Sequence, residues 1–333
     1  MSNGRTAINS VESLDSIGIK WKGSPSNWAT IPRGILNTCT IHGNVIDSSG
    51  IHLYKLSAIG PLGDGTFGTV DSYNALYADG SQRVVAVKRP KHPEVDLFME
   101  ALFQWRVHKS LQEYGLGFSI PEVYNIFRYK QNGDVWFSMR AYTPVLLSAW
   151  CLKNLRRDGT TFGYLILQIS LVLEVMENAL RIDHRDLKVN NIIVVDEKSE
   201  ISIAWKGVAK KISFPFHVVF IDFGYACAGD IIDIKSHDGI PPIDLCPKEG
   251  RDMFQILVSL WRIDALREIL ESCWGGWIRS RIESAEPHFS YLRLAESAPS
   301  LNWMYSVTDN TKFRAPLCAP SIIIQDCMRI LEC

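Results

Sequence analysis

The octet HRDLKVNN, at residues 184–191, gathers two cations, an acid, two amides and an imidazole directly before the apolar run IIVV. Transfer of a phosphoryl group needs a carboxylate at the acceptor hydroxyl, a cation near the migrating phosphate and oxygen ligands for a metal ion. Asp186, Lys188 and Asn191 supply one of each. The octet is therefore predicted to be a phosphoryl-transfer site, and a polar turn between a helix and a strand is the alternative.

A glycine-rich stretch, GPLGDGTFGTV, contains Gly63-x-Gly65-x-x-Gly68-x-Val70 at a turn between two expected strands. Glycines let the backbone lie close over a phosphate chain with its N–H groups pointing inward. A dinucleotide-binding Rossmann site would need a helix after the glycines, whereas a strand follows here. The stretch is predicted to cover nucleotide phosphates, with an ordinary glycine-rich hairpin as the alternative.

The strand RVVAVKRP carries Lys88, which is predicted to reach the α- and β-phosphates of a nucleotide under the glycine turn. A solvated edge lysine is the alternative interpretation. A phosphate-binding lysine needs an anionic partner, and the helix expected after it offers Glu94, Glu100 and Glu113. Glu100 is the preferred partner, because it lies in mid-helix among apolar residues while the other two lie near the ends.

The stretch VFIDFGYAC places Asp222 at the end of an apolar strand, with Gly224 after it to permit a sharp turn. Asp222 and Asn191 are predicted to hold Mg²⁺ at the β- and γ-phosphates. An isolated Asp-Phe-Gly is common. The prediction depends on the order of the parts along the chain, which is glycine loop, lysine, glutamate, octet and metal aspartate.

In this order the motifs resemble the eukaryotic-type protein kinase family over roughly residues 54–275, and Lys188 in the octet is similar to its serine/threonine branch. The resemblance implies a bilobal α+β fold, with a small β-rich N-lobe that has one helix and a larger, mainly α C-lobe. It also implies ATP and Mg²⁺ as cofactors, with Mn²⁺ as an alternative metal. The implied acceptor is a serine or threonine hydroxyl of a protein substrate.

The resemblance further implies which residues surround the nucleotide. Val70, Ala86 and Ile193 border the adenine. Met139 is the gatekeeper, and Arg140–Tyr142 form the hinge whose backbone recognises adenine. The positions that the resemblance assigns to ATP are Gly63, Gly65, Phe67, Gly68, Val70, Ala86, Lys88, Met139, Ala141 and Ile193.

Four residues are expected to support the site rather than to react. His184 is predicted to be a packed, hydrogen-bonded core residue, and Arg185 a cation directed toward the activation segment. Gly224 permits the turn after the metal aspartate. Asp252 looks like the family's buried aspartate, which ties a long C-lobe helix to the catalytic loop.

The elements that must position these residues follow from periodicity. Alternating apolar and polar residues from Tyr54 onward predict three strands, then an amphipathic helix, then a hairpin, which gives a five-stranded lobe. Helical spacing dominates after Pro144. We predict an N-terminal extension at 1–50 and a kinase domain at 51–333, divided into an N-lobe at about 51–142, a C-lobe at about 143–333 and an insertion at about 197–216.

Composition limits which other classes of protein the chain fits, such as nucleic-acid-binding, membrane and secreted proteins. The chain has 333 residues and 47% hydrophobic content, enough for a large core, and its 35 basic and 36 acidic residues give no field to attract nucleic acid. The apolar stretch at 162–180 contains Gln168, Glu174 and Glu177, so a buried helix is favoured over a membrane span. Without a signal-peptide pattern we expect an intracellular protein, cytoplasmic or nuclear, whose eight scattered cysteines are free thiols.

The chain departs from the family after Gly224, because no Ala-Pro-Glu precedes Asp252. Between Asp222 and Asp252 the hydroxyl residues are Tyr225 and Ser236, which indicates a constitutively competent enzyme. The shortened segment leaves two alternatives, a kinase of a small-molecule or lipid hydroxyl and a non-catalytic nucleotide-binding scaffold. The sequence after residue 282 shows no motif, and the oligomeric state stays open.

Overall fold

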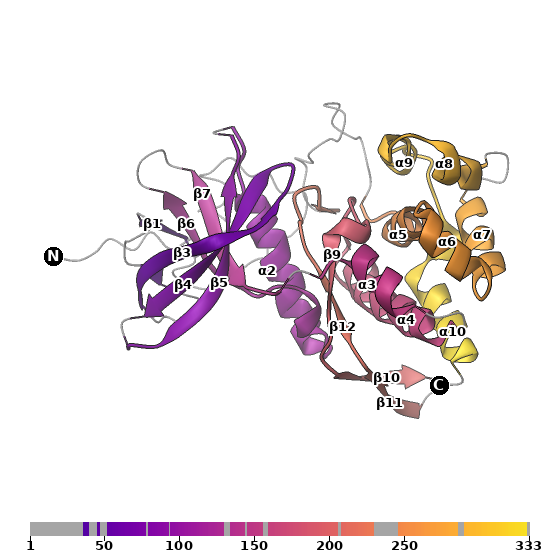
Figure 1. The fold of residues 1–333 in the computed structure, drawn as a ribbon, viewed down its shortest axis with the longest axis horizontal. Helices are drawn as coiled ribbons and strands as arrows, with labels where there is room; N and C mark the ends of the chain where they lie inside the picture. Colours follow the sequence, from indigo (N-terminus) through magenta and orange to yellow (C-terminus); the bar gives the residue numbers. More distant parts are fainter. Residues whose placement is uncertain are drawn as a thin grey trace.

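The protein has a β-rich N-terminal lobe followed by a mainly helical C-terminal lobe, as the computed structural model shows (Figure 1). The structure describes residues 36–39, 45–46, 52–77, 79–92, 94–129, 134–143, 145–155, 159–205, 208–229, 246–285 and 290–331. The bilobal, protein-kinase-like α+β fold that the sequence predicts is confirmed.

Seven strands form the N-lobe sheet, in the order β1-β6-β7-β5-β4-β3-β2. Their bounds are Leu36–Cys39 (β1), Val45–Ile46 (β2), His52–Asp64 (β3), Gly68–Tyr77 (β4), Gln82–Pro90 (β5), Val123–Tyr129 (β6) and Val135–Arg140 (β7). The sequence indicates five strands, because β1 and β2 are too short to show a period. They add to the two edges of the sheet, where β1 pairs in parallel with β6 and β2 pairs antiparallel with β3.

The register of the sheet decides which side chains face the second lobe. Val70 pairs with Lys88, and Ala86 pairs with Met139. Directly paired residues share a face, as do residues two apart on one strand, so these four side chains lie on the same face. This face packs against the helix α2 (Phe98–Glu113) and the large core. The opposite face has a separate core of Leu56, Tyr73, Ala75, Tyr77, Val85, Val87, Tyr124 and Trp136.

Helix α2 is almost wholly buried between the sheet and the C-lobe. No glycine or proline interrupts it, and the Asp96 carboxylate accepts a hydrogen bond from the Phe98 N–H (2.9 Å) at its start. Inside the core, the Gln104 amide donates to the Pro121 carbonyl (2.9 Å) and contacts Met139 Sδ (3.2 Å). These bonds fix α2, and with it Glu100, against the sheet.

Helices form most of the C-lobe (Figure 1), and α4 packs against the C-terminal α10. The helices are α3 (Leu147–Asn154), α4 (Thr160–Glu174, extended by a π-helical turn at Val175–Ala179), α5 (Arg251–Trp261), α6 (Asp264–Glu271), α7 (Gly275–Glu283), α8 (Tyr291–Ser297), α9 (Asn302–Thr308) and α10 (Pro320–Ile330). Short strands flank the catalytic segments, namely β8 (Ile182–Asp183), β9 (Ile192–Val195), β12 (His217–Phe220) and β13 (Cys227–Ala228). Single 3₁₀ turns lie at Gly117–Ser119, Val189–Asn191 and Pro316–Cys318.

The segment Thr160–Ala179 is long and apolar enough to cross a membrane, yet 72% of its most apolar window is buried inside the protein. Its polar side chains find partners there. Gln168 donates to the Phe216 carbonyl (3.1 Å), and Ser170 donates to the Ile166 carbonyl (2.8 Å). This helix is therefore part of the C-lobe core, as the sequence predicts.

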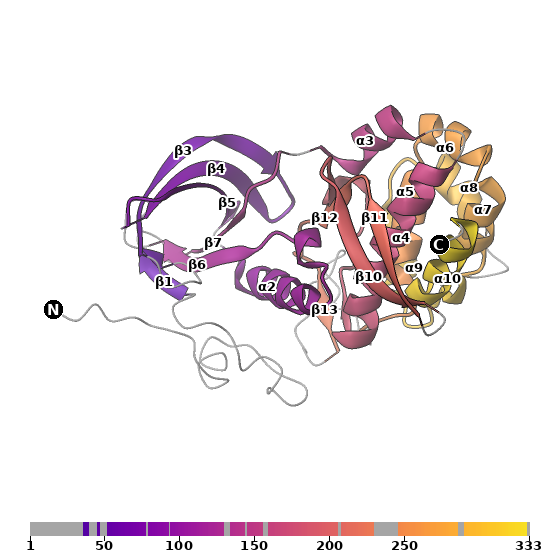
Figure 2. The same ribbon diagram turned by 90° about the horizontal axis from the view of Figure 1, so that it is seen from below.

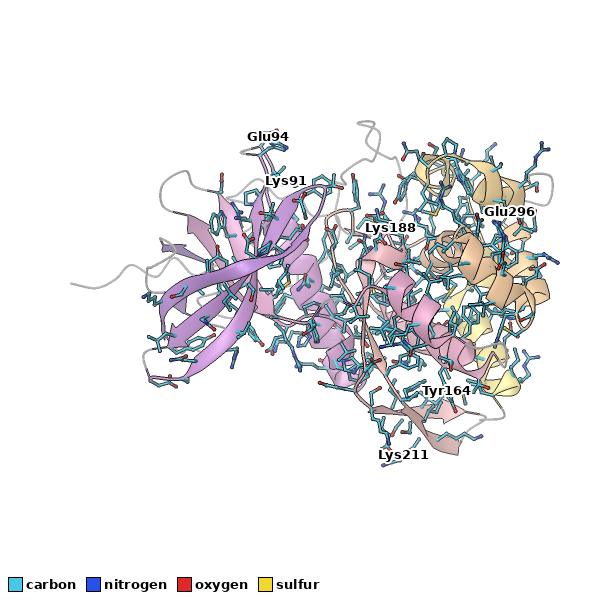
Figure 3. All side chains as sticks on the ribbon, in the orientation of Figure 1. Lys91, Glu94, Tyr164, Lys188, Lys211 and Glu296 are labelled. Carbon is cyan, nitrogen blue, oxygen red and sulfur yellow. A yellow bond between two sulfur atoms is a disulfide. The ribbon has the colours of Figure 1, made fainter. Side chains whose placement is uncertain are left out.

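The stretch predicted as an insertion forms the β-hairpin of β10 (Ser199–Trp205) and β11 (Val208–Phe214), which Figure 2 shows next to β12. Lys211 pairs with Glu200 (2.9 Å), and both side chains are exposed. Figure 3 places Lys211 far from Lys188 of the octet. The hairpin therefore exposes one face to solvent, while Ile201, Ile212 and Phe214 are buried in the large core, and it lies apart from the octet.

The prediction that all cysteines are free thiols is wrong for one pair. Cys227 in β13 and Cys246 form a disulfide, with their Cα atoms 6.3 Å apart. The two residues are separated by 19 positions without a recognisable spacing motif, so the tertiary fold and not the sequence pattern brings them together. Cys151 and Cys318 are buried free thiols, and burial raises the pKa of both.

Reduction of this disulfide is expected to destabilise the protein by about 3 kcal/mol, the cost typical of opening a loop of this size in the unfolded chain. Urea unfolding with and without a reductant measures the effect. The double variant Cys227→Ala/Cys246→Ala serves as the control, because its unfolding midpoint should not respond to the reductant. An unchanged midpoint in the wild-type protein would contradict the prediction.

Candidate active site

Asp252 holds the start of the catalytic loop from the first turn of α5. Its two carboxylate oxygens accept hydrogen bonds from the backbone N–H groups of His184 (2.7 Å) and Arg185 (2.9 Å). Burial raises the pKa of Asp252, while these two N–H groups act in the opposite direction. Arg185 has a positive φ of 64°, a conformation that costs a non-glycine residue energy, and the two bonds help to hold it.

The same face of α5 holds the rest of the loop. Gln255 accepts a hydrogen bond from the Leu187 N–H (3.1 Å), and the Ser259 hydroxyl accepts one from the Val189 N–H (3.2 Å). The sequence interpretation identified Asp252 and missed these two residues. Positions 252, 255 and 259 recur at helical spacing within a mainly apolar helix, a signal that makes these two residues candidates without showing what they contact.

A half-buried carboxyl group near this support should make stability depend on pH. Burial raises the pKa of Glu177 to about 8 and nearby Asp183 raises it further, while the N–H of Gly250 acts in the opposite direction. Because this folded-state value lies above the unfolded value of 4.5, the contribution of Glu177 is full below about pH 4.5 and is lost as pH rises through 8.

We therefore expect Glu177→Gln to gain stability relative to wild type between pH 5 and pH 8, by on the order of 1 kcal/mol, since partial exposure screens the effect. Urea unfolding midpoints at the two pH values provide the measurement. Glu113→Gln, at an exposed carboxyl group, is the matched control and should track the wild-type protein. Parallel pH profiles for wild type and Glu177→Gln would show that Glu177 does not titrate in this range.

The structure brings together the three residues of the octet that are predicted to act in phosphoryl transfer. Lys188 Nζ lies 2.9 and 3.0 Å from the two carboxylate oxygens of Asp186. The 3₁₀ turn at Val189–Asn191 places the Asn191 amide so that Nδ2 donates to the backbone carbonyl (2.8 Å) and carboxylate (2.9 Å) of Asp186. The amide oxygen of Asn191 therefore points away from Asp186, where it is able to bind a metal ion.

His184 and Arg185, the first two residues of the octet, are fully buried. His184 Nε2 lies 3.0 Å from the Ile221 carbonyl, and burial lowers the pKa of the imidazole, so the neutral ring donates this bond. Arg185 donates to the carbonyl of Tyr225 (3.3 Å), which follows the Asp-Phe-Gly motif, and to the carboxylate of Asp309 (3.0 Å). Both residues thus link the octet to the segment that begins at Asp222.

Lys88 lies between two carboxylates. Its Nζ is 2.5 Å from Glu100 Oε1 and 2.8 Å from Asp222 Oδ1. Burial alone would lower the pKa of Lys88, but the two carboxylates raise it above its ordinary value. Burial acts to raise the pKa of Asp222, but the charge and hydrogen bond of Lys88 act in the opposite direction. The net result is a pKa of Asp222 below its ordinary value. Lys88 and Asp222 are therefore charged at neutral pH, and Lys88 connects α2 of the N-lobe with Asp222, the predicted metal ligand.

The glycine loop lies directly over this triad. A Cβ atom added at Gly65 would lie 3.3 Å from Asp222 Oδ2, and one at Gly68 would lie 2.6 Å from the Arg89 carbonyl and 3.1 Å from Lys88 Cε. Glycine is needed at position 68, where a Cβ atom would clash with backbone, and at position 65 a Cβ atom would require a small shift of the Asp222 side chain. By contrast, a Cβ atom at Gly63 would meet open space.

The tip of the loop touches the Asp-Phe-Gly segment. The Phe67 ring lies 4.8 Å from the Tyr225 ring, and a Cβ atom added at Gly224 would lie 2.6 Å from Phe67. Gly224 therefore has a packing role beside its predicted role in the turn.

Residues from both lobes form the predicted adenine side of the candidate site. Val70, Ala86 and Met139 lie on the sheet face that looks toward the C-lobe core. Ala141 is half-buried after β7, and Ile193 is buried in β9, where it bridges to Leu146. The structure thus brings the predicted ATP residues to one junction between the lobes, while their part in ATP binding stays a prediction.

The donor set fits the predicted cofactors. Asp222 offers a carboxylate and Asn191 an amide oxygen, which are the hard oxygen ligands that Mg²⁺ prefers. The backbone of Asn191 is tied to the metal aspartate's strand, because its carbonyl accepts the Ile221 N–H (3.0 Å). The glycine loop also comes close to Lys88 and Asp222, the residues predicted to hold the phosphates and the metal ion.

A residue outside every predicted motif also reaches the octet. Tyr305, in α9, donates its hydroxyl to Asp186 Oδ1 (2.5 Å) and accepts a hydrogen bond from Lys188 Nζ (3.1 Å). It lies 119 positions from Asp186 in the chain. No local pattern in the sequence identifies this contact, because it depends on how α9 packs on the C-lobe.

Comparison with known proteins gives one partial relative. The chain is 28% identical over 153 residues to the MAP kinase kinase mkk-4 of Caenorhabditis elegans. This similarity covers 43% of the chain and 40% of mkk-4, so the chain spans less than half of that relative's length. No protein-family model matches the chain. The similarity supports a relationship to protein kinases.

Proposed function

We propose that the protein is an ATP- and Mg²⁺-dependent serine/threonine protein kinase. The observation that carries the proposal is the convergence of two groups at one junction between the lobes. Asp186, Lys188 and Asn191 form the first group, and the ion-paired Lys88 and Asp222 belong to the second. The partial similarity to a MAP kinase kinase supports the same class of reaction and a protein acceptor.

Each side chain has a distinct role in the proposed transfer. Lys88, held by Glu100, positions the α- and β-phosphates of ATP under the glycine loop. Asp186 orients the acceptor hydroxyl and takes its proton as the hydroxyl oxygen bonds to the γ-phosphorus and the bond to ADP breaks. Lys188 stabilises the negative charge on the migrating group. Asn191 and Asp222 would hold Mg²⁺, which would supply positive charge to neutralise the phosphates.

A kinase of a small-molecule or lipid hydroxyl is the second candidate function. The chain lacks the Ala-Pro-Glu motif of the peptide platform, and Tyr305 of α9 lies at Asp186, where an acceptor must bind. The first feature removes a motif that positions peptide substrates, and the second occupies one oxygen of Asp186 that an acceptor would need.

Incubation of the purified protein with radiolabelled ATP and Mg²⁺ tests the proposal. A generic basic protein and a panel of metabolites and lipids, offered separately, serve as acceptors, and an excess of chelator serves as the control. We expect label on serine and threonine of the basic protein, and its loss when the metal is removed. Label confined to a metabolite or lipid would favour the second candidate. Binding of ATP without transfer to any acceptor would identify a nucleotide-binding scaffold.

A further inference from the structure

The hydroxyl of Tyr305 lies where the proposed reaction needs its acceptor. An acceptor hydroxyl must donate a hydrogen bond to the carboxylate of Asp186 and lie near Lys188. Tyr305 does both, at 2.5 Å from Asp186 Oδ1 and 3.1 Å from Lys188 Nζ. Figure 3 shows Lys188 at the junction between the lobes, and Figure 1 shows α9 on the same side of the C-lobe. While Tyr305 keeps these bonds, another acceptor is excluded from that oxygen of Asp186.

Buried polar contacts of the residues that follow Tyr305 in the chain hold α9 in place. Lys248, which is 2% exposed, donates to the carbonyls of Thr308 (2.9 Å) and Asn310 (2.6 Å). The Thr308 hydroxyl also accepts a hydrogen bond from Gln255 (3.0 Å), the residue that holds the catalytic loop.

Charge holds the same segment. The carboxylate of Asp309 pairs with the fully buried Arg185 of the octet (3.0 Å) and lies 3.8 Å from Arg251. Buried ion pairs and hydrogen bonds of this kind are costly to break. The end of α9 is thus fastened directly to the catalytic loop, which places the Tyr305 side chain next to Asp186, while the bonds to Asp186 and Lys188 hold the side chain itself there.

The chemical state of Tyr305 suits an acceptor. Burial raises the pKa of its phenol, and the neighbouring Asp186 carboxylate raises it further. The phenol is therefore neutral at physiological pH and needs a base to take its proton. Asp186 is that base in the proposed mechanism, and its carboxylate already accepts the hydrogen bond along which the proton would move.

We propose that Tyr305 is an intramolecular phosphoryl acceptor and that the protein phosphorylates this residue in its own active site. The inference rests on the proposed function. The Tyr305 hydroxyl oxygen forms a bond to the γ-phosphorus of ATP, the bond between that phosphorus and the bridging oxygen breaks, the proton passes to Asp186, and ADP leaves.

The product places about two negative charges beside the carboxylate of Asp186, because a phosphotyrosine is close to dianionic at neutral pH. Repulsion between Asp186 and the phosphate breaks the hydrogen bond that held Tyr305 at the catalytic loop. Phosphorylation of Tyr305 thereby frees Asp186 for an external acceptor. The segment after Asp222 has few hydroxyl residues for activation, and Tyr305 takes over that regulatory role from a different part of the chain.

Mass spectrometry of the purified protein after incubation with ATP and Mg²⁺ tests the proposal. We expect phosphate on Tyr305, formed with a first-order rate that stays constant over a hundred-fold dilution of the protein. Tyr305→Phe keeps the ring and removes the acceptor, so it should lose this phosphate while transfer to an added basic protein rises several-fold. Tyr114→Phe, at an exposed tyrosine after α2, is the matched control and should behave as wild type.

Three outcomes separate the inference from the proposed function. Transfer to the basic protein without phosphate on Tyr305 would overturn the inference and leave the proposed function intact. A rate of Tyr305 phosphorylation that rises in proportion to protein concentration would overturn the intramolecular step. Absence of transfer to Tyr305 and to every added acceptor would remove the proposed function, and the inference with it. Because the dilution series uses wild-type protein, it decides the question even where Tyr305→Phe is poorly folded.

Discussion

Asp186→Asn is expected to lower the rate of phosphoryl transfer about 100- to 10,000-fold, the range that a general base contributes. The substitution keeps the size of the side chain but removes the carboxylate that Lys188, Asn191 and Tyr305 all contact. An amide is a far weaker base than a carboxylate, so it cannot take the proton of an acceptor hydroxyl at neutral pH. Nucleotide binding should change little, because Asp186 is placed at the acceptor and not at the phosphates of ATP.

Two measurements check this prediction together. Initial rates with labelled ATP give the loss of turnover, and titration with a fluorescent nucleotide analogue gives the affinity for ATP. Asp264→Asn, at an exposed carboxylate that pairs with Arg267 on α6, is the matched control and should keep wild-type rates. Full transfer by Asp186→Asn would show that Asp186 is not the base. Loss of nucleotide binding would show that Asp186 acts on the nucleotide and not on the acceptor.

Residues that lie close in the chain, or in elements with a clear period, were predictable. The choice of Glu100 rested on an expected mid-helix position among apolar neighbours. The structure places Glu100 in the first turn of α2, so the expected position was wrong, whereas the buried apolar surroundings and the contact with Lys88 are present. The order of strands, helix and hairpin in the N-lobe followed from alternation and helical spacing. Asp252 came from the family resemblance, and the structure shows its two bonds to the octet backbone.

Contacts that depend on tertiary packing were not predictable. The Cys227–Cys246 disulfide and the contact of Tyr305 with Asp186 join segments with no common pattern. The edge strands β1 and β2 gain their hydrogen bonds from neighbours rather than from their own sequence. In each case the position of a short segment depends on the segment that packs against it, and the local sequence pattern does not show which segment that is.

The loop support on α5 is an intermediate case. Gln255 and Ser259 carry a helical-spacing signal, but polar residues in a buried helix are also explained by local bonds to the preceding turn. The Ser259 hydroxyl makes such a bond to the Ile256 carbonyl (3.0 Å) as well as its bond to the catalytic loop. The spacing therefore identifies candidates, and the structure alone distinguishes a support of the loop from a residue bonded within its helix.

Lys88→Met is expected to lower turnover at least about 100-fold, because a buried, prepositioned charge at the phosphates is worth a factor of this order or more. The same substitution should also destabilise the protein by about 3 kcal/mol, since it leaves the Glu100 carboxylate, with its side chain 1% exposed, without the cation that neutralises it. Lys88 thus contributes to both activity and stability, and a loss of activity alone does not separate the two.

The double variant Lys88→Met/Glu100→Gln separates them. Removing both charges takes away the fully buried carboxylate that Lys88→Met leaves without its cation, and Asp222, whose side chain is 22% exposed, loses Lys88 in both variants. The double variant should therefore be more stable than Lys88→Met, while its turnover stays as low. Urea unfolding and initial rates on the same preparations measure the two effects. Recovered stability without recovered turnover means that Lys88 acts on the phosphates directly, beyond holding α2 in place. Wild-type turnover in either variant would contradict the proposed phosphate contact and would leave the ion pair with a purely structural role.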